Sequence, residues 1–177
     1  MNVVYLGNLI PIAQGIRRIP GVQLVGCILE EGDDDAEELL AWSDSLGVPS
    51  YGVRSNPEIR SAFKRIGPVD LGVITNFGII LSPPVLAIPK DGFVNAHFGI
   101  LPENPGRHPI TKVLEERASL TGVTLHRVTE KPDAGPILDK RMIAVGLNPD
   151  RVDLFDRLTK LSHDLIVQHL SQSGPGR

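Results

Sequence analysis

The chain has 177 residues, of which 41% are hydrophobic and 22% are charged, and its formal net charge is −3. This size and composition are typical of one globular domain with a substantial core, so we expect a single domain over residues 1–170 and a frayed tail at 171–177. The weak negative charge argues against nucleic acid or an anionic membrane as a partner, and the lack of a secretory signal or an apolar run of about 20 residues favours a cytoplasmic protein.

Strand-like apolar runs alternate with helical patterns along the chain, which predicts an α/β fold with a twisted, mostly parallel sheet. The expected strands are residues 3–6, 23–29, 70–75, 91–97, 121–128 and 137–145. The expected helices are residues 10–19, 36–46, 57–66, 109–117 and 152–170, and the last of these is amphipathic. In such a fold the active site is expected at the carboxyl ends of the central strands.

The first strand-to-helix turn, residues 6–11, contains a single glycine, Gly7. It lacks the glycine-rich patterns that bind a dinucleotide or a triphosphate. We therefore expect the chemistry in the C-terminal half of the chain.

Neither a disulfide nor a metal site is expected. Cys27 is the single cysteine, which excludes an internal disulfide and a multi-cysteine metal site, and its apolar surroundings predict a core residue. The acidic run Asp33–Asp35 fits the start of a helix better than a metal site. The histidines lack the i, i+4 or clustered spacing that a metal ion needs.

The strongest candidate for chemistry is Asn95-Ala96-His97, at the end of an expected strand and before a loop rich in proline and glycine. Because strand side chains alternate between faces, Asn95 and His97 project to the same side. A neutral amide donor beside an imidazole is suited to stabilising an oxyanion and moving a proton. Asp133, in a Pro-Asp-Ala-Gly-Pro turn, could orient His97 or carry a proton. The competing interpretation is structural, with Asn95 and His97 shaping a turn and Asp133 forming an Asx turn.

Four blocks of the sequence resemble the formyltransferase family, which uses 10-formyltetrahydrofolate. The blocks are residues 93–97, Leu101-Pro102 with Pro105-Gly106, residues 122–126 and residues 133–137. The family pattern Asn-x-His followed by Asp is matched by Asn95, His97 and Asp133. The resemblance implies a Rossmann-like three-layer fold and a folate-dependent N-formyltransferase of one-carbon metabolism.

The resemblance also implies a mechanism and a folate pocket. Asn95 and His97 would stabilise the oxyanion that forms when an acceptor amine attacks the formyl carbonyl, and Asp133 would assist proton transfer from the attacking nitrogen. When the family's folate pocket is carried over to the matching positions of this sequence, it has two sides. One is formed by Phe77, Gly78, Ile79, Ile80 and Leu81, and the other by Val128, Thr129 and Glu130.

The chain departs from the family at positions that bear on its substrates. Ile79 stands where the transformylase branch has an arginine, which affects the pteridine or glutamate-tail contacts but not the chemistry. That branch binds its substrate phosphate with a Gly/Ser/Asn-rich first loop, which residues 7–10 do not provide. The tRNA enzymes carry a C-terminal nucleic-acid domain, which we do not expect here. The implied acceptor is the amine of a small molecule, such as an amino sugar or a biosynthetic intermediate, and its identity stays open.

Two alternatives to a transferase also stay open. In a formyltetrahydrofolate hydrolase, water replaces the amine at the same three residues, and in a non-catalytic folate-binding protein the pocket is kept without turnover. Near the site, His108 is a candidate acceptor contact. Thr124 is either a hydrogen-bond partner near Asp133 or a residue that favours the strand, and His126 is a packed residue or part of the pocket wall. A homodimer is compatible with the size of the chain.

Overall fold

The computed structural model describes residues 1–32 and 34–172. The predicted helix start at Asp33–Asp35 lies partly outside the described residues. Residues 173–177 of the predicted tail also lie outside them. Across the described residues no helix has both the length and the apolar character to cross a membrane.

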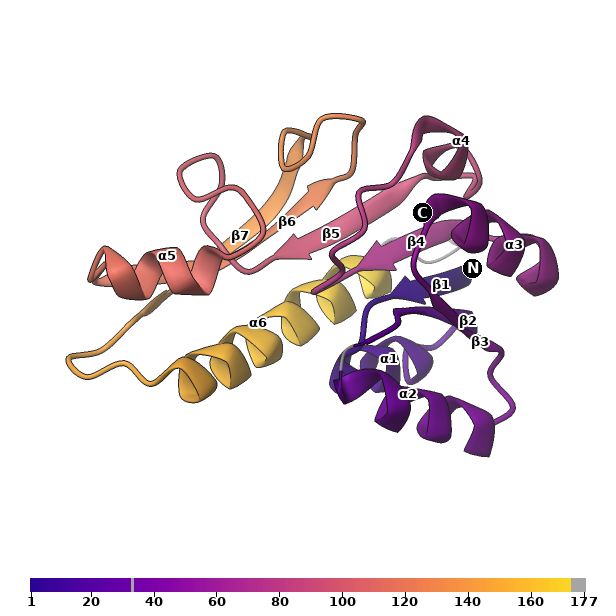
Figure 1. Cartoon of the computed structure of the whole chain (residues 1–177), viewed down its shortest axis with the longest axis horizontal. Coiled ribbons are helices and arrows are strands. Elements are labelled where there is room, and N and C mark those ends of the chain that lie inside the picture. Colours follow the sequence, from indigo (N-terminus) through magenta and orange to yellow (C-terminus); the bar gives the residue numbers. More distant parts are fainter. Residues whose placement is uncertain (33, 173–177) are drawn as a thin grey trace.

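Seven strands among the described residues form one sheet in the order β3-β2-β1-β4-β5-β6-β7 (Figure 1). Their bounds are β1 Asn2–Leu6, β2 Gln23–Glu30, β3 Ser50–Val53, β4 Leu71–Ile74, β5 Phe93–His97, β6 Leu120–Arg127 and β7 Ile137–Ala144. The strands from β3 to β5 pair in parallel, whereas β6 is antiparallel to both β5 and β7. The predicted mostly parallel sheet is therefore confirmed, with an antiparallel hairpin at one edge.

Helices cover both faces of this sheet. The helices are α1 Ile10–Arg17, α2 Asp34–Ser45, α3 Asn56–Ile66, α4 Pro83–Leu86, α5 Pro109–Glu115 and α6 Arg151–Gln172. Helices α1, α2 and α6 cover one face, α3 and α4 the other, and α5 packs against α6 (Figure 1). Two separate apolar clusters, one on each face, make this the expected three-layer α/β architecture.

Two short elements were not predicted from the sequence. Strand β3 follows Pro49 and contains Gly52, both of which are unfavourable in strands, and it forms because β2 offers a parallel edge. Helix α4 begins with Pro83 and Pro84, which resemble a helix-breaking pair but are tolerated in the first turn, where the backbone N–H groups have no partner in the helix. Local sequence signals favoured loops at both places.

Cys27 lies in the sheet core and is 0% exposed. Burial raises the pKa of its thiol to about 12, because the charged thiolate is poorly solvated there. The thiol therefore stays protonated and unreactive at neutral pH, and the prediction of a core cysteine is confirmed.

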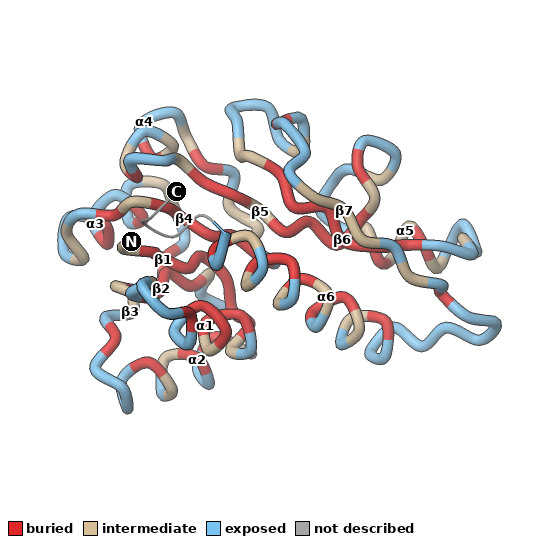
Figure 2. Tube along the Cα trace, turned by 180° about the vertical axis from the view of Figure 1, so that it is seen from behind, coloured by how far each residue is buried: buried red, intermediate tan, exposed pale blue. Residues whose placement is uncertain are grey.

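The arrangement of β5 explains where a site can form. Val94 and Ala96 point to the α6 face and are 1% exposed, while Phe93 completes the apolar cluster under α3 and α4. Asn95 and His97 follow Phe93 on that second face, beyond its last apolar contact with the helices. Exposed loops, together with α5, surround this end of the sheet (Figure 2).

Candidate active site

Strands β5 and β6 bring four polar side chains to one face of the sheet. The antiparallel register pairs Asn95 with His126 and His97 with Thr124. Directly opposed residues project to the same face, so all four side chains point away from α6. The predicted common orientation of Asn95 and His97 is confirmed, since both line one cavity.

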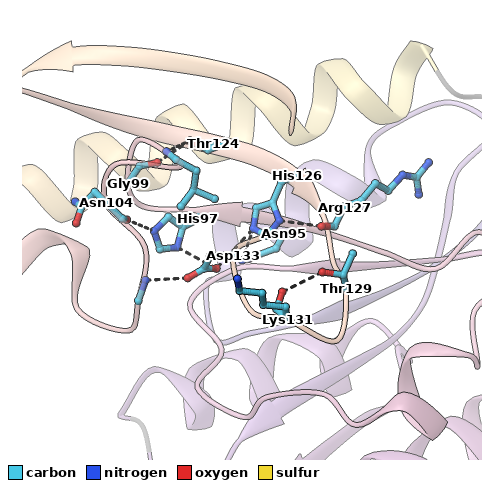
Figure 3. A network of polar contacts seen from close by, with 12 residues as sticks. Asn95, His97, Gly99, Asn104, Thr124, His126, Arg127, Thr129, Lys131 and Asp133 are labelled. Carbon is cyan, nitrogen blue, oxygen red and sulfur yellow. Dashed lines mark hydrogen bonds and ion pairs between the residues drawn. The ribbon is translucent and has the colours of Figure 1, made fainter. Parts of the chain in front are cut away.

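Asn95 and His126 form a defined donor–acceptor pair (Figure 3). His126 Nδ1 lies 2.9 Å from the Arg127 carbonyl oxygen, which can only accept, so Nδ1 carries the hydrogen. Burial lowers the pKa of His126, against the opposing effects of this hydrogen bond and of the Asp133 charge. The neutral ring then accepts at Nε2 from Asn95 Nδ2, 3.2 Å away. The second N–H of the Asn95 amide is left for a ligand.

His97 is oriented by the loop that follows it. Its Nε2 donates to the Asn104 carbonyl oxygen at 2.8 Å, so in the neutral ring Nδ1 keeps its lone pair. Nδ1 faces Asp133 Oδ1 at 3.8 Å, too far for a direct hydrogen bond. Two acceptors at this separation leave a position for a donor between them, such as the N–H of an amine.

Asp133 is held between the two imidazole rings. Its Oδ1 is 3.8 Å from both His97 Nδ1 and His126 Nε2, and its Oδ2 accepts from the Gly106 N–H at 2.8 Å. Asp133 has φ 52°, a left-handed conformation that is uncommon outside glycine. Such conformations persist where the surrounding structure holds them, often at functional sites.

The turn that carries Asp133 folds tightly back on β6. A Cβ atom at Gly135 would lie 1.8 Å from the Arg127 carbonyl oxygen, so only glycine fits there. Thr129 Oγ1 donates to the Lys131 carbonyl oxygen at 2.9 Å and closes the first part of the turn (Figure 3). Local contacts therefore fix the carboxylate over the sheet.

Asn95, His97, His126 and Asp133 all line one cavity of about 780 Å³. This volume lies within the range of small-molecule sites. Glu30, Glu31 and Gly32, at the carboxyl end of β2, also line it. The cavity lining therefore extends beyond the C-terminal half, where the chemistry was expected, because parallel strands bring β2, β4 and β5 to the same edge of the sheet.

Most of the residues carried over for the folate pocket line this cavity. They are Phe77, Gly78, Ile79, Ile80, Leu81, Val128 and Thr129. Glu130 is exposed and lies outside the lining. His108, the candidate acceptor contact, also lines the cavity. Within the described part of the chain, no three His, Cys, Asp or Glu side chains are placed to hold a metal ion.

Thr124 has a different role from the one expected. Its hydroxyl donates to the Gly99 carbonyl oxygen at 2.7 Å and accepts from the Leu101 N–H at 3.0 Å. Thr124 therefore anchors the loop after His97, and neither of these two hydrogen bonds involves Asp133. His126 was expected in the pocket wall, but its contacts with Asn95 and Asp133 were not predicted, because the β5–β6 register was not known from the sequence.

We expect His126→Phe to lower turnover by about tenfold, because it removes the acceptor that fixes the Asn95 amide and a hydrogen bond typically contributes about 1 kcal/mol. His126→Gln keeps an oxygen acceptor and should recover part of the loss, with the KM for the substrates unchanged in both variants. Steady-state kinetics of the two variants measure this. Equal turnover in His126→Phe and the wild type would exclude a positioning role.

Burial of His126 also predicts a pH dependence of stability. The folded-state pKa is lowered, so the unfolded chain binds the proton more readily and stability falls as the pH drops below the ordinary value of 6.5. Denaturant unfolding between pH 7 and pH 5 should therefore show a steeper loss in the wild type than in His126→Gln. Parallel curves would contradict this. His169, whose pKa burial also lowers, is present in both proteins and cancels in the comparison.

Comparison with known proteins places this site in a family. The family model described as "Formyl transferase" matches residues 50–170. The chain is 36% identical to methionyl-tRNA formyltransferase of Methylococcus capsulatus over 131 residues, which cover 74% of this chain and 42% of that protein. It is also 36% identical to the methionyl-tRNA formyltransferase of Thermotoga neapolitana over 187 residues, covering 97% of this chain and 58% of that protein. The chain thus spans about half the length of these relatives.

Solved structures share the fold over nearly the whole chain. Phosphoribosylglycinamide formyltransferase from Bacillus halodurans matches with a TM-score of 0.81 at 21% identity. The match covers 97% of this chain and 94% of that protein's chain. A sugar N-formyltransferase from Shewanella matches with a TM-score of 0.72 at 20% identity. The match covers 97% of this chain and 68% of that protein's chain. The family match and the sequence identities together show that this chain belongs to the formyl transferase family.

Proposed function

We propose that this chain transfers a formyl group from 10-formyltetrahydrofolate to the amino group of a small-molecule acceptor. The observation that carries the proposal is the convergence of Asn95, His97 and Asp133 in one cavity, with Asp133 Oδ1 3.8 Å from His97 Nδ1. An amide donor, an imidazole and a carboxylate are the groups that acyl transfer to an amine requires.

The segment after β4 and the β6–β7 turn are the proposed site of the formyl donor. Ile79, Leu81 and Val128 supply apolar surface for a flat ring, and neighbouring backbone groups can read its polar edge. Asn56 fixes the first segment, because its Nδ2 donates to the Ile80 carbonyl oxygen at 2.9 Å and its Oδ1 accepts from the Ser82 N–H at 2.8 Å. A segment held in this way is preorganised for binding.

The oxyanion of the transfer step is assigned to Asn95 and His97. When the acceptor nitrogen bonds to the formyl carbon, the carbonyl oxygen gains negative charge, and the free Asn95 N–H stabilises it. The His97 ring does the same in its protonated form, in which Nδ1 also carries a hydrogen. His126 and the Asn104 carbonyl fix these two side chains before the reaction, so little reorganisation is needed. One preorganised donor is typically worth about 10²–10³ in rate.

Proton movement is assigned to Asp133. The attacking amine must lose a proton, and Asp133 Oδ1 faces the position between the two rings where that N–H would lie. Asp133 accepts this proton and passes it to the donor nitrogen, and the bond from the formyl carbon to that nitrogen breaks as the nitrogen is protonated. The products are the N-formylated acceptor and tetrahydrofolate, so atoms and charge balance.

The test is release of tetrahydrofolate from 10-formyltetrahydrofolate by purified protein with different acceptors. The panel contains glycinamide ribonucleotide, amino-sugar nucleotides, methionine-charged tRNA and water alone. Release that depends on one small amine supports the proposal and identifies the acceptor. Release only with the charged tRNA contradicts a small-molecule acceptor, and equal release with water alone indicates a hydrolase.

A further inference from the structure

Two arginines line the cavity, one from the segment before α5 and one from the start of α6. Arg151 is the first residue of α6, and its Nη1 donates to Thr111 Oγ1 at 2.7 Å. Arg107 precedes α5, and its Nη2 donates to the Gly78 carbonyl oxygen. Both side chains are exposed, and neither forms an ion pair with a carboxylate among the described residues. The cavity therefore contains two positive charges that no described carboxylate neutralises.

The carboxylates of the cavity are engaged elsewhere. Glu30 Oε2 accepts from the Gly78 N–H at 2.6 Å, and Glu31 forms an ion pair with Arg54 at 2.8 Å. Asp133 is bound by Gly106 and faces the two histidines. None of these groups is paired with Arg107 or Arg151.

The acidic residues at the start of α6 do not neutralise Arg151 either. Asp150 Oδ2 accepts from the Asp153 N–H at 3.1 Å and caps the helix, and the Asp153 carboxylate lies 3.4 Å from Arg157. Neither aspartate lines the cavity. Among the described residues, no carboxylate at this helix start forms an ion pair with Arg151.

An aromatic pair links the end of β5 to α6. Phe98 follows His97 directly, and its ring packs against Phe155 of α6, with 5.6 Å between the centroids. Arg151 lies four residues before Phe155, so the two share one face of the helix, about one turn of 5.4 Å apart. In Figure 1, α5 and the first turn of α6 lie beyond the carboxyl end of β5, away from the β6–β7 turn assigned to the donor.

The first loop of the fold is closed to such a ligand. Asn8 and Leu9 are 2% and 5% exposed, and residues 7–9 do not line the cavity. The beginning of α1 is therefore not available as an anion site in this structure.

We propose that Arg107 and Arg151, with Thr111, form an anion subsite for the acceptor, so that the acceptor is an amine carrying a phosphate or carboxylate group. The amine lies between His97 and Asp133, and the apolar part of the acceptor passes the Phe98–Phe155 pair to reach the arginines. This inference rests on the proposed formyl transfer, and it adds the class of acceptor and the residues that select it.

Isothermal titration measures the binding of inorganic pyrophosphate, O-phosphoethanolamine, β-alanine and ethanolamine to the wild type, Arg107→Met and Arg151→Met. Methionine keeps most of the apolar stem and removes the charge. Arg60→Met is the matched control, because Arg60 is an exposed arginine of α3 that does not line the cavity. Binding of 5-formyltetrahydrofolate, an unreactive isomer of the donor, is titrated on all four proteins.

We expect the wild type and Arg60→Met to bind the anionic probes more tightly than ethanolamine, and each cavity variant to weaken that binding about tenfold, in line with the loss of a charged hydrogen bond. A preference for O-phosphoethanolamine over β-alanine identifies a phosphate, and the reverse identifies a carboxylate. Equal binding by all four proteins, or no binding of any anion, overturns the subsite. Weaker binding of 5-formyltetrahydrofolate to either cavity variant assigns the anion to the donor and overturns the acceptor subsite.

The inference and the proposed function fail in different ways. If no protein binds 5-formyltetrahydrofolate but the two cavity variants still lose the anion, folate-dependent transfer is excluded while the anion subsite stands. If folate binds to all four proteins and the anion binds to none, the subsite is excluded while the proposed donor site stands.

Discussion

The Asp133→Asn substitution should lower formyl transfer by about 10²- to 10⁴-fold, the range expected when a positioned proton acceptor is lost. An amide cannot take the proton of the attacking amine, so turnover falls while donor binding is unaffected. Asparagine tolerates the left-handed conformation at φ 52°, and its carbonyl oxygen can still accept from the Gly106 N–H. The turn should therefore keep its shape.

Pre-steady-state measurement of tetrahydrofolate release gives the effect on the chemical step, and the thermal midpoint reports whether the fold is intact. A variant with an unchanged midpoint and at least a hundredfold slower release supports proton transfer by Asp133. Release within a few-fold of the wild-type rate would show that Asp133 is not the acceptor of the proton.

The Asn95→Ala substitution is expected to lower turnover by about 10²- to 10³-fold through loss of an oxyanion donor. The change removes both the N–H that is free for the ligand and the N–H that His126 accepts. Because Asn95 acts on the transition state, the dissociation constant of 5-formyltetrahydrofolate should stay the same while kcat falls.

Asn56→Ala provides the contrast for this measurement, since Asn56 holds the proposed donor segment at Ile80 and Ser82 rather than the reacting atoms. It should raise the KM for the donor and leave kcat nearly unchanged. If Asn95→Ala instead raises KM at constant kcat, Asn95 is a binding residue and the assigned oxyanion role is wrong.

The sequence predicts part of this site and not the rest for identifiable reasons. The alternation of Phe93, Asn95 and His97 along one strand places two polar side chains on one face, and the structure has them there. The partnership of Asn95 with His126 depends on the antiparallel pairing of β5 with β6. That register is a property of the folded sheet, and no local pattern around His126 signals it.

The same distinction applies to the fold. The long elements carry clear apolar periodicity and were predicted, whereas β3 and α4 are four residues each and contain glycine or proline. Their formation depends on tertiary contacts, with β2 for β3 and with the cluster around Val85 for α4. The cavity lining from Glu30 to Gly32 was missed for a related reason, since it depends on the position of β2 in the sheet.

The most direct test of the account follows the formyl carbon itself. Protein is incubated with 10-formyltetrahydrofolate labelled with ¹³C in the formyl group and with the amine that stimulates release, and the products are read by NMR. The account predicts that the label appears in an N-formyl amide of the acceptor, in equal amount to the tetrahydrofolate formed, and that Asp133→Asn abolishes both signals together. Label found only in formate, or left entirely in the donor while folate is bound, would contradict formyl transfer to an amine.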